Sequence, residues 1–117
     1  MDLTENYQNL ANAIIVRAAK DYRASRTYLK NHPKTDELVE TVKQQKQRRK
    51  KRKEKREALG LPEVQEKKTL EEHRLSRIRH AEKMQKETES FFRSAWFRQL
   101  SGLDGCALLK RLEEEYA

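Results

Sequence analysis

Glycine, proline and cysteine are scarce in this chain of 117 residues, which contains three, two and one of them respectively. So few turn-forming residues cannot supply the many chain reversals of a β-sandwich or a β-barrel. The single cysteine, Cys106, leaves no disulfide framework and no cysteine-based zinc site. Good helix formers dominate instead, namely Ala, Leu, Glu, Lys, Arg and Gln. The composition therefore predicts an all-α protein.

Large apolar residues are also few, since Leu, Ile, Val and Phe together make up 23 of the 117 residues. This fraction lies at the border between foldable and disordered chains, so it excludes a large core and predicts one domain. The longest apolar run, residues 13–16, is too short for a membrane-spanning helix or a signal peptide. We therefore expect a cytoplasmic protein with no membrane partner.

Positive charge is concentrated in one segment, residues 43–56, which we call the basic run. It holds ten Lys or Arg and one Glu, whereas the formal net charge of the whole chain is +8. Cations at this density repel one another, so the run either stays hydrated or binds a polyanion and releases its counterions. A solvated helix face is the alternative interpretation. The candidate residues for binding nucleic acid or a nucleoprotein are Lys43, Lys46, Arg48, Arg49, Lys50, Lys51, Arg52, Lys53, Lys55 and Arg56.

Apolar residues recurring every three or four positions predict a first helix over residues 2–30. Asp2 and Glu5 form a capping-box-like pair at its start, and Pro33 prevents its continuation. Thr35 is the expected N-cap of the next helix.

Gly60 is expected just beyond the end of this second helix, near Leu59, and a third helix is predicted to begin near Pro62. Such a short turn favours an antiparallel helical hairpin. We therefore expect residues 43–88 to form a basic helical arm, with residues 1–42 and 89–117 supplying the core helices of a small bundle.

The densest apolar segment of the chain, FFRSAWF at residues 91–97, continues the third helix in this interpretation. Asp104 is the expected N-cap of a last amphipathic helix, and we expect the aromatic segment to be buried between that helix and the first one. The alternative is an exposed aromatic platform that stacks nucleobases or anchors a protein. That platform would consist of Arg93, Trp96, Phe97 and Arg98.

Catalytic motifs are absent from the sequence, which has no glycine-rich phosphate loop, no GxSxG and no HExxH. His73 and His80 are seven residues apart, about 10 Å along a helix, which is too far to share a metal ion. We therefore expect no enzyme activity, no metal and no cofactor. The oligomeric state stays open, because a second copy could complete the thin apolar face of the second and third helices in a homodimer.

The two ends of the chain, NAIIVRAAKDYRAS (residues 12–25) and ESFFRSAWFRQLSGLDGCALLKRLEEE (residues 89–115), resemble a family of small, mostly uncharacterised phage and prophage proteins of Gram-positive bacteria. Asp104 and Gly105 match this family, whereas residues 43–88 correspond to its divergent part. The resemblance implies an accessory protein acting in the bacterial cytoplasm. Such a protein would either help in DNA metabolism or packaging, or inhibit host defence, for example as an anti-CRISPR inhibitor of Cas9.

Together with the resemblance, these observations predict a non-enzymatic phage-type protein that binds a nucleic-acid-containing host complex through the basic run and inhibits host defence, with Cas9 and its guide RNA as the candidate target. Two alternatives stay open, a DNA- or RNA-binding protein without sequence preference and a structural helical oligomer. The run contains no interleaved aromatic residues, so we expect its contacts to be with phosphates.

Overall fold

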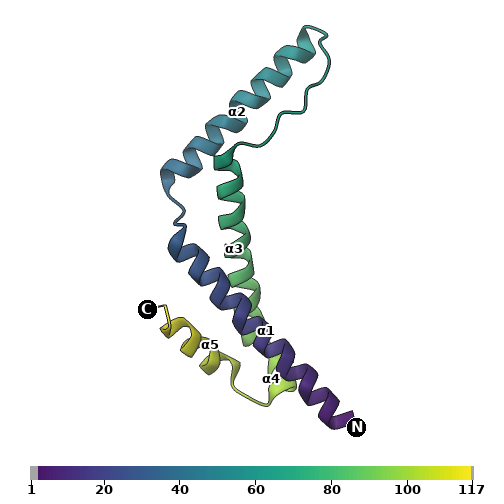
Figure 1. The fold of residues 1–117 in the computed structure, drawn as a ribbon, viewed down its shortest axis with the longest axis vertical. Coiled ribbons are helices and arrows are strands. Elements are labelled where there is room, and N and C mark those ends of the chain that lie inside the picture. The colour runs from purple at the N-terminus through teal and green to yellow at the C-terminus, as the bar shows by residue number, and fades with distance from the viewer. Residues whose placement is uncertain (1–2, 117) are drawn as a thin grey trace. The chain divides into compact units, whose positions relative to one another are not determined.

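The structure, a computed structural model, describes residues 3–116, which form helices and no strand (Figure 1). The helices are α1 (Leu3–Asn31), α2 (Asp36–Ala58), α3 (Leu70–Arg93), α4 (Ala95–Ser101) and α5 (Gly105–Glu114). The predicted all-α class is therefore confirmed. The first helix ends before Pro33 as expected, while its predicted start at Asp2 lies outside the described residues.

Two compact units make up the chain. The terminal unit combines residues 1–31 with residues 80–117, and the basic unit comprises residues 32–79. The basic unit therefore covers residues 32–79, whereas the sequence pattern predicts a basic arm of residues 43–88. The first turns of α2 belong to the basic unit, where Val42 and Leu75 of α3 are both buried and line one pocket.

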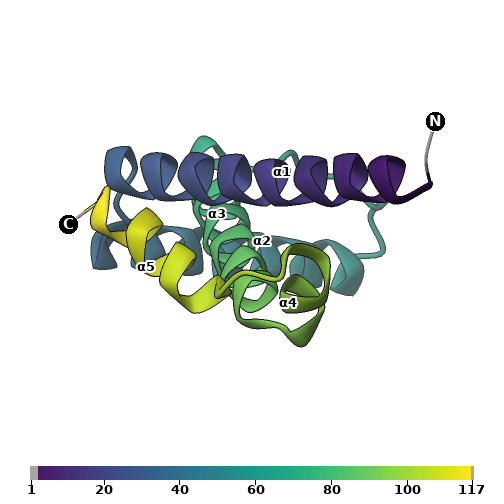
Figure 2. The same cartoon turned by 90° about the horizontal axis from the view of Figure 1, so that it is seen from below.

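The terminal unit contains a core to which α1, α3, α4 and α5 all contribute, and α1 packs against both α4 and α5 (Figure 2). Its buried residues are Tyr22, Phe92, Phe97, Leu109 and Leu112. The predicted burial of the aromatic segment between the first and last helices is therefore confirmed for its two buried phenylalanines.

A helix break at Ser94 interrupts the aromatic segment, so the prediction of one continuous helix through residues 91–97 is wrong. Ser94 has extended backbone angles, and its Oγ accepts a hydrogen bond from the Phe97 amide at 3.1 Å. Phe92 and Phe97 are five residues apart, so in an unbroken helix they would point about 140° away from each other. The break lets both rings enter the same core, with centroids 5.4 Å apart.

The last helix begins as predicted, with the Asp104 side chain accepting hydrogen bonds from the Cys106 and Ala107 amides. Gly105, the first residue of α5, allows a close backbone approach. A Cβ atom at this position would lie 1.8 Å from the carbonyl oxygen of Phe92. Any larger residue would therefore push α5 away from the end of α3.

Candidate nucleic-acid interface

Helix α2 carries the whole basic run between two well-formed caps. The Leu38 amide donates to Thr35 Oγ1 at 3.1 Å at the start. At the end, Gly60 has a φ of 68°, and the Leu61 amide donates to the Arg56 carbonyl at 3.0 Å, as in a Schellman motif. Both caps were predicted and are confirmed. They allow the repelling cations of this segment to be presented on an ordered helix.

One side of α2 continues the apolar stripe of its first turns as a charged stripe. Four cations follow Leu38, Val42 and Gln45 at spacings of three and four residues. This spacing places the four cations on the same side of the helix as these three residues. We call these four cations the inner face. They are Arg49, Arg52, Lys53 and Arg56.

Residues 59–69, which we call the return segment, run back beside α2 before α3 begins (Figure 1). Thr69 Oγ1 donates to Gln45 Oε1 near the middle of α2, so the segment spans the inner face. The prediction that the third helix starts near Pro62 is therefore wrong.

The actual start of α3 is determined by a capping box at residues 69–72. The Glu72 amide donates to Thr69 Oγ1 at 3.2 Å, and the Thr69 amide donates to Glu72 Oε2 at 3.1 Å. The Thr-x-x-Glu pattern at residues 69–72 is the sequence signal for this start, and it prevails over the helix-starting tendency of Pro62.

Glu66 of the return segment pairs with all three arginines of the inner face. Arg52 donates from Nε and Nη2 to the two carboxylate oxygens at 2.8 and 3.2 Å, Arg56 Nη2 donates to Oε1 at 3.2 Å, and Arg49 Nε lies 3.6 Å from Oε2. The hydrogen bonds from Arg52 and Arg56, chiefly those from Arg52, lower the pKa of Glu66. Glu66 therefore stays ionised in mild acid and keeps the return segment on α2.

Arg49 forms the most buried ion pair of this interface, with Glu72, whose side chain is only 3% exposed. Arg49 Nη2 donates to Glu72 Oε2 at 3.0 Å, while Nη1 lies 2.8 Å from Oε1. The hydrogen bond from Arg49 is the main cause of the lowered pKa of Glu72. Lys53 and Glu63 form a looser, exposed pair at 3.8 Å. Every inner-face cation is thus paired within the fold, by three carboxylates that lie outside the basic run.

The remaining surface of α2, its flanks and the side opposite the inner face, presents five exposed cations that have no ion pair within residues 3–116. We call them the outer face, which consists of Lys43, Arg48, Lys50, Lys51 and Lys55. Glu54, the one acidic residue of the run, is also exposed. The structure therefore splits the ten candidate residues into a structural set and an available set, with Lys46 at the border.

Lys46 lines a pocket of about 180 Å³ between α2 and α3. Four cations and a single acid, Glu72, contribute to its walls. The complete lining is Val42, Lys46, Arg49, Lys68, Glu72, Leu75, Ser76 and Arg79. Positive charge consequently extends from α2 onto α3 within the basic unit.

The secondary surface suggested by the aromatic segment is only partly available. Phe97 is fully buried in the core, so its expected role in an exposed platform is wrong. Trp96 is 53% exposed, and its ring meets the Phe91 ring edge-on at a centroid distance of 5.5 Å. Arg93 and Arg98 are also exposed. Three of the four residues expected in the platform are therefore accessible, but Trp96 and Arg98, two residues apart on α4, point in different directions.

In the part of the chain that the structure describes, no group of three or more His, Cys, Asp or Glu side chains is arranged to hold a metal ion. None of the described helices is long and apolar enough to cross a membrane. Comparisons with protein-family models, curated proteins and solved structures find no match for this chain. The resemblance to phage accessory proteins stays a prediction.

Proposed function

We propose that this protein binds nucleic acid through the outer face of α2, by contacts with phosphates and without sequence preference. The observation that carries the proposal is the division of α2 into two charged sides. Each inner-face cation has a carboxylate partner within the fold, whereas the five outer-face cations are exposed and have no ion pair within the described chain.

The spacing of the outer face suits a phosphate backbone. Lys43 and Lys55 are twelve residues apart, which corresponds to about 18 Å along a helix. Phosphates of one DNA strand are separated by about 3.4 Å along the duplex axis, so about five of them fit this length. Neutralising phosphates releases condensed counterions, which favours binding at low salt. The exposed lysines provide charge without the fixed geometry needed to read bases.

A narrower form of the same proposal is that this protein inhibits a Cas9-type nuclease. Its support is the resemblance of residues 12–25 and 89–115 to phage accessory proteins. A basic surface cannot imitate a DNA duplex, so such an inhibitor would use the outer face to grip guide RNA or a target strand. It would obstruct loading of the guide, entry of the DNA or movement of a nuclease domain.

A salt titration of binding tests the proposal, with a fluorescently labelled 20-bp duplex and the full chain. Neutralising five phosphates predicts a slope of log affinity against log salt of about −4.5 for the wild type. Changing all five outer-face residues to Gln is expected to reduce the slope to nearly zero. A control with the same net charge changes five exposed cations outside the basic run to Gln, namely Lys20, Arg77, Lys86, Lys110 and Arg111.

The control is expected to keep most of the wild-type slope, because local phosphate contacts and not net charge determine it. Equal losses in the two variants would contradict the proposal, as would a wild-type chain that binds no duplex.

A pull-down from host lysate with and without nuclease treatment distinguishes a general nucleic-acid-binding protein from an inhibitor of a Cas9-type nuclease. A single protein partner that resists nuclease supports the inhibitor, whereas recovery of nucleic acid alone supports the general binding protein.

A further inference from the structure

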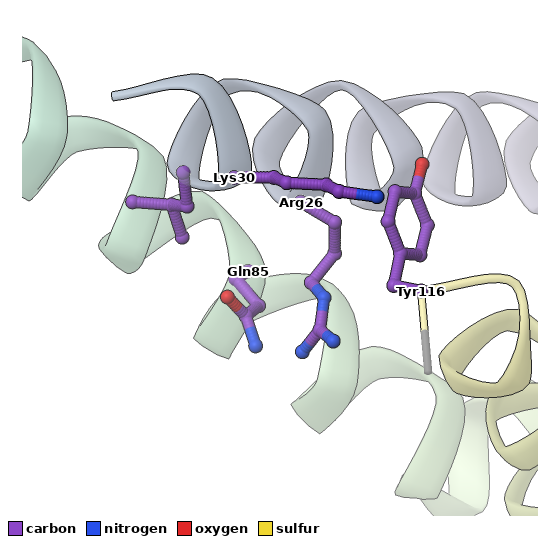
Figure 3. A pocket seen from close by; sticks show the side chains of 5 residues that line it. Arg26, Lys30, Gln85 and Tyr116 are labelled. Atoms are coloured by element: carbon purple, nitrogen blue, oxygen red, sulfur yellow. The ribbon is translucent and has the colours of Figure 1, made fainter. Parts of the chain in front are cut away.

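A second pocket lies within the terminal unit. It has a volume of about 290 Å³, at the lower end of the range for small-molecule sites. Residues of α1, of α3 and of the turn after α5 line it (Figure 3). The lining residues are Arg26, Leu29, Lys30, Gln85 and Tyr116.

This lining combines two cations with no carboxylate. Arg26 and Lys30 are four residues apart on α1, so they lie on the same side of the helix, and Figure 3 shows both beside Tyr116. The neighbouring Arg23 differs, because Glu115 accepts two hydrogen bonds from it at 2.9 and 3.0 Å. The fold thus pairs one α1 arginine with a carboxylate, whereas Arg26 and Lys30 form no ion pair within the described chain, and the acid at the edge of the pocket, Glu89, accepts a hydrogen bond from Gln85.

Aromatic rings hold Arg26 in place without neutralising it. Its guanidinium carbon lies 5.9 Å from the Tyr22 ring centroid and 5.4 Å from that of Tyr116, within the range of cation–π attraction. Tyr22 is fully buried, and the Tyr116 hydroxyl donates to the Arg23 carbonyl at 2.9 Å. Both rings are therefore fixed. A cation held in this way is preorganised for an anionic ligand.

Gln85 adds a polar group on the α3 side of the pocket. Its Nε2 donates to Glu89 Oε1 at 3.0 Å, which fixes the side chain and leaves a second N–H for another acceptor. Leu29 and the Tyr116 ring supply apolar walls. The pocket therefore offers charge and hydrogen-bond donors at one place and an apolar surface next to them.

We propose that this pocket binds a small phosphate monoester. The dianionic phosphate would bridge Arg26 and Lys30 and accept a hydrogen bond from Gln85, while the body of the ligand packs on Leu29 and Tyr116. Two adjacent cations match the charge of a phosphate monoester better than that of a single carboxylate. The site is independent of the outer face of α2, so either proposal can fail without the other.

Residue-resolved NMR on the full ¹⁵N-labelled chain tests the proposal with phenyl phosphate as the probe. Saturable amide shifts are expected around residues 26–30, 85 and 116. Arg26→Gln and Lys30→Gln should each weaken binding about tenfold, because each removes a charge-assisted contact. Lys20→Gln, an exposed α1 variant outside the pocket, should change it less than about twofold.

Arg26→Gln also removes the stacking on two tyrosines, so Lys30→Gln provides the variant that leaves this packing intact. Shifts confined to residues 43–56 would overturn the proposal, since they would show phosphate binding to the basic run alone. Shifts around the pocket that do not saturate would overturn it too, as would an equal loss in the Lys20 variant. Benzoate binding as tightly as phenyl phosphate would overturn the assignment to phosphate.

Discussion

Replacing Glu66 by Gln is the most informative single change, because Arg52 and Arg56 of α2 share this carboxylate as their ion-pair partner. Arg52 contacts it through two hydrogen bonds and Arg56 through a third. The amide of Gln retains the shape of the side chain and removes its charge. We expect the return segment to loosen and both arginines to become available to a nucleic acid.

The magnitude follows from the number of cations released. Each additional phosphate contact steepens the slope of log affinity against log salt by about 0.9 for duplex DNA, so two arginines add up to about 1.8. A fourfold increase in salt would then weaken binding by about twelvefold more in the variant than in the wild type. At low salt the variant is expected to bind more tightly than the wild type.

Fluorescence anisotropy with a labelled duplex at several salt concentrations measures the slope. Hydrogen exchange of residues 59–69 reports in parallel whether the return segment has loosened. Glu57→Gln is the matched control, because Glu57 lies on α2 near the two arginines in sequence, is exposed and has no side-chain ion pair within the described chain. This control makes the same change in net charge without releasing an arginine, so its slope should equal that of the wild type.

One combination of results would refute the reasoning. If hydrogen exchange shows that the return segment has loosened in the Glu66 variant while the slope stays at the control value, released arginines on α2 do not contact phosphates. The interface would then lie elsewhere on the chain, and the division of α2 into two faces would have no bearing on binding.

Three further predictions concern stability. Folding lowers the pKa of Glu66 and of Glu72. Their contribution to stability is therefore complete above the ordinary glutamate pKa of about 4.3 and is lost as the pH falls through the lowered pKa values. Urea unfolding at pH 6 and at pH 3 measures this loss. Thr69→Ala removes the N-cap of α3 and should lower the free energy of unfolding by about 1 kcal/mol in urea titrations. Phe97→Ala should lower it by about 3–5 kcal/mol, whereas Trp96→Ala, at a position that is 53% exposed, should lower it by about 1 kcal/mol in the same assay.

Features that depend on a few neighbouring residues were predictable from the sequence. The caps at Thr35, Gly60 and Asp104 are formed as expected, because each depends on one side chain or one left-handed glycine and on backbone groups within a few residues. The location of the core at the chain ends was also predictable, since the apolar stripes of the first and last helices have no other partner of comparable size.

Features that depend on distant pairing were not predictable in the same way. Pro62 favours the first turn of a helix, but Glu66 pairs with Arg52, fourteen residues earlier, while the segment is extended. The choice between helix and extended chain is therefore decided by tertiary contacts. The break at Ser94 has a similar origin, because it is the core that requires both phenylalanines on the same side.

The same limit applies to the candidate interface. The sequence locates the ten candidate cations in the basic run, but it does not show which of these cations pair with carboxylates inside the fold. Arg49 finds its partner Glu72 at a separation of 23 residues, beyond any local pattern of charge. Only the structure distinguishes this arginine from Lys50, the next residue along the helix.

The two faces of α2 differ in residue type as well as in pairing. Three of the four inner-face cations are arginines, and four of the five outer-face cations are lysines. A planar guanidinium makes two parallel hydrogen bonds to a fixed carboxylate, as Arg52 does with Glu66, whereas a lysine ammonium is a hydrated point charge with little geometric preference. Arginine therefore suits the internal pairs, which must have one geometry, and lysine suits contacts that can shift along a phosphate backbone. This partition favours an outer face that recognises charge and is indifferent to nucleic-acid sequence.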